Sequence, residues 1–443
     1  SFFVNAGIRF VTEMCKMRAF VDLWDEILIE RYGIENPKFR RFRYGVQVNS
    51  LGLTEQQPEN NVYRILIEML AVTLSKKARA RAVQLPAWNE ALGLPRPWDQ
   101  QWSMRMQQIM AFETDLLEYE DLFDGNSVVD TKVEALKTSA RYELKTIESQ
   151  GGALESIDYM KSRLVESNTL RLQNIESKQT TVVGVNKYIN TEVSPLVSGD
   201  GGIMVVDPLV EKDQIDRLNK WRASRNQTTV ENALNNLRKA ALAGKNIMPA
   251  SIEAAKAGAT TGEWAQEMRN IYGEYRGPTG VAAGISNQTE GLDEIRSAVD
   301  AVSDKLGERL KFLIGKPGLD GHSNGAEQIA SRARDCGMKI EYEGIRLTPQ
   351  ELVDTVKTSK AHVIGLSILS GSHIPLVQDM MTLLAEEGLM NIPVVVGGII
   401  PEEDKSKLLQ MGIAKVYTPK DFEMNTIMMD IVNLAEPREI AAE

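Results

Sequence analysis

A glycine-rich segment near the C-terminal end carries the strongest candidate in the chain for metal chemistry. It runs from Gly315 to Gly325 and follows an apolar run that is typical of a buried strand. His322 stands two residues after Asp320, and a metal-bound imidazole usually donates its other N–H to a carboxylate. Lys316 can extend this pair to a third member. A lone histidine in a loop is more often a capping or solvated residue, and the spacing from Asp320 makes metal ligation by His322 the alternative.

The small number of histidines narrows the kind of metal site. The chain has three, His322, His362 and His373, and none before residue 322. A single histidine cannot hold a zinc ion, which takes about four ligands. It suffices where a macrocycle such as a haem or a corrin fills the other positions. We interpret His362 as structural and His373 as a solvated helix cap or a peripheral ligand contact.

The surrounding elements predict how this segment is held. Five strands are expected at 310–314, 339–343, 362–368, 393–396 and 414–417. Helices lie between them, for instance at 324–335 and 374–387. This alternation predicts a doubly wound parallel sheet of the flavodoxin-like (Rossmann-type) class, which binds ligands at the carboxyl ends of its strands.

The first part of the chain predicts a second α/β region. Strands are expected at 1–5, 42–47 and 82–85, with a helix over 62–70 between the last two. Asp99 is expected to cap a further helix, whose core face is Trp102, Met106, Ile109 and Met110. Strands that alternate with helices in this way indicate parallel βα units.

The middle of the chain is expected to be mostly helical and charged. Residues 126–180 form helices broken at Gly151 and Gly152, and 181–185 is a lone strand candidate. Loose segments are expected at 196–210 and 276–287, and more helices lie between them. The expected domains are therefore 1–125, 126–307 and 308–443.

Composition excludes several classes of protein. The 443 residues carry 51 Lys and Arg against 61 Asp and Glu, a net charge of −10. An acidic chain is a poor binder of nucleic acid or of a membrane surface, and no apolar run is long enough to cross a membrane. Two cysteines cannot make a disulfide framework, which favours a cytoplasmic location.

Three blocks of sequence resemble the cobalamin-binding domain of vitamin B12 enzymes, whose pattern is Asp-x-His-x-x-Gly, then Ser-x-Leu, then Gly-Gly. Here the blocks are Asp320, His322 and Gly325, then Ser367 and Leu369, then Gly397 and Gly398. The resemblance implies that His322 becomes the lower cobalt ligand in place of the cofactor's own base. Asp320 and Lys316 would stand behind it.

The same resemblance implies a slot for the displaced nucleotide tail. Gly325, Gly397 and Gly398 would leave room for the tail, and Ser367 would contact it. Leu369 is as readily a core residue as a contact.

Residues 1–190 resemble the end of the barrel in coenzyme B12-dependent acyl-CoA mutases. The resemblance rests on residues 2–6, on Gln47 with 53–61, and on 89–95, 150–154 and 183–187. Residues 84–90 look most like the ethylmalonyl-CoA branch, because Pro86 stands where methylmalonyl-CoA mutases have Asn. The resemblance implies that Gln47 lines the cavity near the corrin and that Glu90 binds the adenosyl ribose. A loop amide and a helix-start carboxylate are the alternative readings.

The implied activity is an adenosylcobalamin-dependent radical isomerisation. The Co–C bond breaks homolytically and the thioester carbonyl group of an acyl-CoA migrates, as from ethylmalonyl-CoA to methylsuccinyl-CoA. The alternatives are a methylmalonyl-CoA mutase, a non-catalytic corrinoid carrier or sensor, and a corrinoid methyltransferase. The last usually has a small helical cap before its cobalamin domain, whereas βα units precede it here.

The implied fold is the C-terminal part of a (β/α)8 TIM barrel, a helical linker and a complete cobalamin domain. Three βα units cannot close a barrel of roughly 250 residues, so we expect a fragment, or another chain that supplies the remaining units. The resemblance further implies an acyl-CoA substrate, a homodimer and a G-protein chaperone for cofactor loading.

Overall fold

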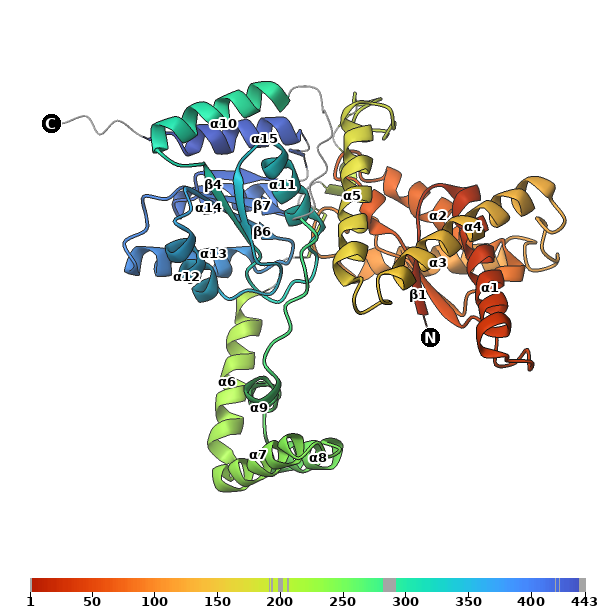
Figure 1. Ribbon diagram of the computed structural model, residues 1–443, viewed down its shortest axis with the longest axis horizontal. Coiled ribbons are helices and arrows are strands. Elements are labelled where there is room, and N and C mark those ends of the chain that lie inside the picture. Colours follow the sequence, from red (N-terminus) through yellow and green to blue (C-terminus); the bar gives the residue numbers. More distant parts are fainter. Residues whose placement is uncertain are drawn as a thin grey trace. The chain divides into compact units, whose positions relative to one another are not determined.

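The computed structural model describes residues 2–190, 192, 194–197, 202–204, 207–281, 292–418, 420–421 and 423–437. The chain divides into two compact units (Figure 1). One comprises Ser1–Met204 with Pro278–Glu443, and the other is Val205–Gly277. The first unit holds both parallel sheets, as expected of an α/β chain, and the second is helical.

A three-stranded parallel sheet opens the chain. Its strands, β1 (Phe2–Ala6), β2 (Tyr44–Val48) and β3 (Ala82–Gln84), lie in the order β1-β2-β3. The helices that follow them are α1 (Phe10–Tyr32), α2 (Asn60–Thr73) and α3 (Pro97–Phe112). Side chains alternate along a strand, so Val46 and Val48 are buried whereas Gln47 between them is exposed. One face of this sheet is therefore packed and the other is open.

A five-stranded parallel sheet forms the C-terminal part of the same unit. Its strands are β4 (Lys311–Gly315), β5 (Lys339–Tyr342), β6 (Val363–Ile368), β7 (Val394–Gly398) and β8 (Lys415–Tyr417). Their order is β5-β4-β6-β7-β8, which is the flavodoxin-like order. The predicted fold class of this region is confirmed.

Helices cover both faces of the five-stranded sheet (Figure 1). One layer holds α10 (Leu292–Leu306), α11 (Asn324–Asp335) and α15 (Met424–Leu434), and the other holds α12 (Pro349–Ser359), α13 (His373–Glu386) and α14 (Glu402–Gln410). Phe312 and Ile314 point into the first core and Leu313 into the second. These strands are apolar on both sides, which is why they were predictable as buried parallel strands.

The remaining helices lie in the middle of the chain. In the first unit they are α4 (Ser127–Ser149) and α5 (Ile157–Glu176), separated at Gly151 and Gly152 as predicted. The second unit consists of α6 (Pro208–Ser224), α7 (Gln227–Leu242), α8 (Met248–Ala257) and α9 (Thr261–Tyr272). Short 3-10 helices span Ser50–Gly52, Lys76–Ala78 and Pro195–Val197. None of the helices in the described ranges is long and apolar enough to cross a membrane.

Two local predictions were wrong. Residues 181–185 do not form a strand: Gly184 has a φ of +83° and Val183 makes only an isolated bridge with Lys187. The predicted core face of α3 is only half packed, since Trp102 is 38% and Ile109 47% exposed whereas Met106 packs against the core. An apolar pattern marks residues that can be buried, and whether a partner covers them depends on the rest of the fold.

The structure bears to different degrees on the predicted Asp99 cap, the loose segments and the domain boundaries. Asp99 does cap α3, although from the third position of the helix, where its carboxylate accepts the backbone N–H of Arg96 at 2.8 Å. Of the predicted loose segments, residues 198–201, 205–206 and 282–287 lie outside the described residues. The domain boundaries at 125 and 307 stay predictions.

Candidate functional site

Lys316, Asp320 and His322 form one connected cluster at the carboxyl end of β4. The Nζ of Lys316 donates to Asp320 Oδ2 at 2.9 Å and to the carbonyl oxygen of Ser367 at 3.2 Å. The other carboxylate oxygen, Oδ1, accepts the backbone N–H of His322 at 3.0 Å and lies 2.7 Å from its ring Nδ1. Ser367 is the penultimate residue of β6, and β6 pairs with β4, so the amine also ties two neighbouring strands together.

The burial of this cluster is graded. Lys316 is 1% exposed, the side chain of Asp320 7% and that of His322 81%. Burial alone would raise the pKa of Asp320, but hydrogen bonds from Lys316 and His322 outweigh it and lower that pKa from 3.8 to about 2. Asp320 is therefore an anion at every ordinary pH.

The charge on Asp320 decides which ring nitrogen of His322 is free. An ionised carboxylate only accepts hydrogen bonds, so the hydrogen-bond network assigns the proton of the neutral ring to Nδ1. The lone pair then lies on Nε2, on a ring exposed to solvent. A carboxylate behind the imidazole is the usual arrangement for a metal-ligating histidine. This donor set fits a cobalt ion held by one histidine.

The glycines at the same edge of the sheet have different surroundings. A Cβ on Gly398 would lie 1.8 Å from the carbonyl oxygen of Ile368, and the φ of Gly398 is +154°, so the backbone itself requires glycine there. By contrast, a Cβ on Gly325 would meet nothing within 4 Å. Gly397 pairs in register with Ser367, which puts both on one face of the sheet. Gly325 is exposed, so the described residues leave its surface open to a ligand.

The other predicted contacts take varied places. Leu369 is half-buried just after β6. His362 accepts the backbone N–H of Lys311 at 2.9 Å through Nδ1, in agreement with a structural role. His373 is not a solvated cap, because it is 4% exposed and its Nε2 lies 3.0 Å from Asp404 Oδ2. Asp404 lies on the neighbouring helix α14, and this contact holds the His373 ring in place.

Gln47 belongs to a row of amides on the open face of the three-stranded sheet. It pairs in register with Asn5 on β1 and with Gln84 on β3, and all three residues are exposed. Asn5 and Gln84 were not singled out from the sequence. The signal was present, since each is a polar residue at the alternating position of an otherwise apolar strand.

Glu90 lies half-buried in the loop after β3. Its backbone N–H donates to the carbonyl of Ala87 at 3.2 Å, and the adjacent Asn89 is fully buried. Asn89 donates to Asp99 Oδ2 at 2.8 Å and to the Gly202 carbonyl at 2.6 Å. The loop that carries Glu90 is thus fixed from behind. Within the described part of the chain, no hydrogen bond joins Glu90 or Gln47 to the His322 loop.

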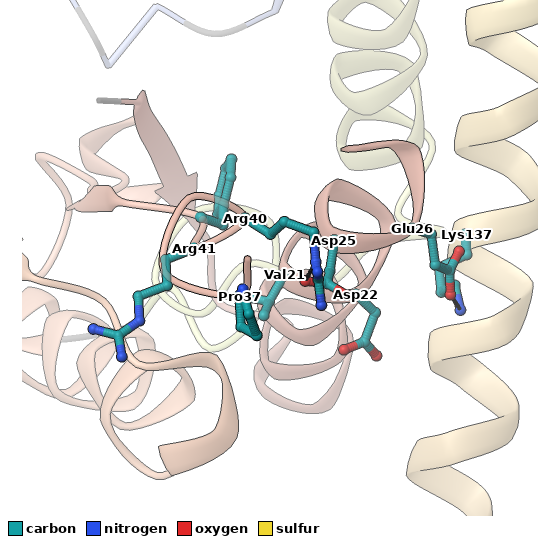
Figure 2. A pocket seen from close by; sticks show the side chains of 9 residues that line it. Val21, Asp22, Asp25, Glu26, Pro37, Arg40, Arg41 and Lys137 are labelled. Atoms are coloured by element: carbon teal, nitrogen blue, oxygen red, sulfur yellow. Dashed lines mark hydrogen bonds and ion pairs between the residues drawn. The ribbon is translucent and has the colours of Figure 1, made fainter. Parts of the chain in front are cut away.

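A separate cleft lies beside α1 and α4 (Figure 2). Its lining includes Asp25, which pairs with Arg40 at 2.8 Å, and Glu26, which pairs with Lys137. Arg40 precedes β2, so the cleft lies toward the amino end of that strand, away from its carboxyl end. None of the predicted site residues lines it.

Comparisons with known proteins identify the class of the site. The family described as B12 binding domain matches residues 310–421, which include the whole His322 loop. The family described as Methylmalonyl-CoA mutase matches residues 1–274. This chain belongs to the methylmalonyl-CoA mutase family and carries a cobalamin-binding domain, which confirms the resemblance seen in the sequence.

Individual relatives refine this placement. The chain is 70% identical to ethylmalonyl-CoA mutase of Cereibacter sphaeroides over 100% of its length and 68% of that protein's. It is 60% identical to the Methylorubrum extorquens ethylmalonyl-CoA mutase over 98% of the chain and 64% of the relative. Methylmalonyl-CoA mutase of Escherichia coli is 31% identical over 98% and 61%. The chain thus spans about two thirds of the length of these relatives.

Proposed function

We propose that this chain serves the adenosylcobalamin-dependent isomerisation of ethylmalonyl-CoA to methylsuccinyl-CoA. The observation that carries the proposal is the free Nε2 of His322, backed by an anionic Asp320 and a buried Lys316. Support for the substrate comes from the identity of 70% with an ethylmalonyl-CoA mutase against 31% with a methylmalonyl-CoA mutase.

The residues of the His322 loop would hold the cofactor and set its lower ligand. Bound adenosylcobalamin supplies a carbon-centred radical through homolysis of its Co–C bond. His322 would bind the cobalt through Nε2, while Asp320 holds the proton on Nδ1 and keeps the ring oriented. Lys316 neutralises Asp320 in a buried setting and thereby keeps the carboxylate ionised.

The residues of the three-stranded sheet would meet the substrate and the adenosyl group. We infer that the exposed amides of Asn5, Gln47 and Gln84 line one wall of the reaction cavity, since active sites of barrels lie at the carboxyl ends of their strands. Glu90, whose loop is fixed through Asn89, would accept hydrogen bonds from ribose hydroxyl groups.

A non-catalytic corrinoid carrier or sensor is the second candidate. It is favoured by one observation: the three described strands of the first sheet leave β1 and β3 as unpaired edges, so these strands alone enclose no substrate cavity. A methylmalonyl-CoA mutase is the third. A homodimer, a G-protein chaperone and a cytoplasmic location complete the proposal; both cysteines are buried free thiols, as a reducing compartment allows.

The test is a turnover assay with separated isomers. The purified protein, with the remaining barrel units present, is mixed with adenosylcobalamin and either ethylmalonyl-CoA or methylmalonyl-CoA, and the isomeric products are resolved by chromatography before mass spectrometry. We expect methylsuccinyl-CoA from the first ester and little succinyl-CoA from the second. Bound cobalamin without turnover of either ester would favour the carrier, and preferential succinyl-CoA formation would favour a methylmalonyl-CoA mutase.

A further inference from the structure

Arg346, in the loop after β5, has a strained backbone. Its φ is +63°, in the left-handed region that non-glycine residues rarely adopt. Lys360 has a similar φ of +55°, but it ends helix α12, where a left-handed residue is usual. No helix ends at Arg346. Strain of this kind persists only where the surroundings hold it, and it often marks a functional position.

The surroundings that hold Arg346 belong to the His322 loop. The next residue, Leu347, donates its backbone N–H to the carbonyl of Lys316 at 3.1 Å and accepts the N–H of Gly318 at 2.9 Å. Leu347 is also 2% exposed, so its side chain anchors the loop in the core. The loop after β5 and the loop after β4 are therefore braced against each other, and Arg346 is held at their junction.

The side chain of Arg346 extends along the cobalt-ligand loop. Its Nη2 lies 3.4 Å from the position that a Cβ would take on Gly321, the residue just before His322. Arg346 is exposed. Among the residues that the structure describes, none accepts a hydrogen bond from this guanidinium and no carboxylate pairs with it. A fork of N–H donors thus stands free beside Gly321, the residue that precedes His322.

We propose that Arg346 binds acceptor oxygens of the bound corrinoid. A corrinoid offers carbonyl oxygens on the amide side chains around its ring and phosphate oxygens in its nucleotide tail. A planar guanidinium can donate two parallel hydrogen bonds to either kind of group. The strained backbone keeps the donors at the edge of the His322 loop before the ligand arrives. This inference rests on the cobalamin-binding part of the proposed function.

The test is a binding titration of Arg346→Gly with two corrinoids. Glycine relieves the strained φ, so the variant should fold, and thermal unfolding checks this. Cobalamin carries the nucleotide tail and its phosphate, and cobinamide lacks both. We expect the Kd for cobalamin to rise roughly tenfold. A matching rise for cobinamide assigns the contact to ring amides, and an unchanged cobinamide Kd assigns it to the phosphate.

Two further variants control the result. Lys360→Gly relieves the same kind of strain at the other end of the strands, because Lys360 precedes β6, and it should leave both Kd values unchanged. Arg346→Lys keeps the charge without the fork and should fall between wild type and glycine. The proposal is overturned if Arg346→Gly binds both corrinoids as wild type does, including the case where only the KM for the acyl-CoA rises. A wild-type chain that binds neither corrinoid would instead break the proposed function.

Discussion

The buried carboxylates beside the two parallel sheets have pKa values shifted in opposite directions. At the end of β4, Asp320 receives hydrogen bonds from Lys316 and His322, and its pKa falls to about 2. On α2, behind the three-stranded sheet, Glu68 is 1% exposed and its Oε2 has no partner. Burial and the nearby Glu13 raise the pKa of Glu68 to about 8, although Arg64 opposes the rise.

The two sheets also differ in how completely the described residues cover their faces and pair their polar groups. The five-stranded sheet is covered on both faces, and its buried Asp320 is paired with Lys316 behind the exposed imidazole of His322. The three-stranded sheet is covered on one face, and the polar row at Gln47 meets no partner that the described residues supply. The five-stranded sheet is therefore organised to receive a ligand, and the three-stranded sheet presents one open wall.

The largest expected effect is at Gly398. A Cβ there would overlap the carbonyl of Ile368, so Gly398→Ala should destabilise the five-stranded region by about 4 kcal/mol or more in chemical denaturation. Gly325→Ala is the matched control, because its Cβ meets no atom. It should change stability by less than about 0.5 kcal/mol and still weaken cobalamin binding. Equal losses of stability in the two variants would show that Gly398 is not required by the backbone in a way that Gly325 is not.

Removing the amine behind Asp320 should have the next largest effect. Lys316→Met leaves a buried carboxylate without its cation, which typically costs about 3–5 kcal/mol. The double variant Lys316→Met with Asp320→Asn removes the stranded charge and should recover part of that loss. Urea denaturation of the two variants measures the difference. If the double variant is as unstable as the single one, the charge pairing is not what stabilises the loop.

The two carboxylates also predict opposite pH dependences. The lowered pKa of Asp320 stabilises the fold above about pH 4, and that contribution disappears as the pH falls toward 2. The raised pKa of Glu68 works the other way: its contribution is complete below about pH 4.5 and is lost as the pH rises through 8. Glu68→Gln should therefore gain stability relative to wild type at pH 9, by on the order of a few kcal/mol. If the stability difference between Glu68→Gln and wild type is the same at pH 6 and pH 9, Glu68 is not buried without a partner.

The smallest effects separate the two faces of the three-stranded sheet. Val46→Ala removes buried methyl groups and should cost about 1.5–3 kcal/mol. Its neighbour Gln47 is exposed, so Gln47→Ala should change stability by less than about 0.5 kcal/mol while lowering turnover. Thermal unfolding measures the stability of both variants, and the turnover assay measures their activity. A stability loss at Gln47 equal to that at Val46 would mean that the open face is packed.

The sequence predicted what is local and missed what depends on contacts between strands and loops. The strands of the five-stranded sheet were predictable because buried parallel strands are short apolar runs, and the His322 cluster because its spacing is short. The alignment of Gln84 with Gln47 depends on strand register, and the position of Arg346 depends on the bracing by Leu347. The strand predicted at 181–185 is an error of the opposite kind. Its apolar residues are typical of a strand, but the backbone turns at Gly184.

The central claim is that His322 is the lower ligand of cobalt, and electron paramagnetic resonance of bound cob(II)alamin tests it most directly. The chain is produced with nitrogen-15 histidine and loaded with unlabelled cofactor. Coordination by His322 predicts that each cobalt line is split into a doublet by the nitrogen-15 nucleus, and that His322→Ala loses this splitting. A triplet that persists in the labelled protein would show that the cofactor's own base remains on the metal, and it would contradict the account.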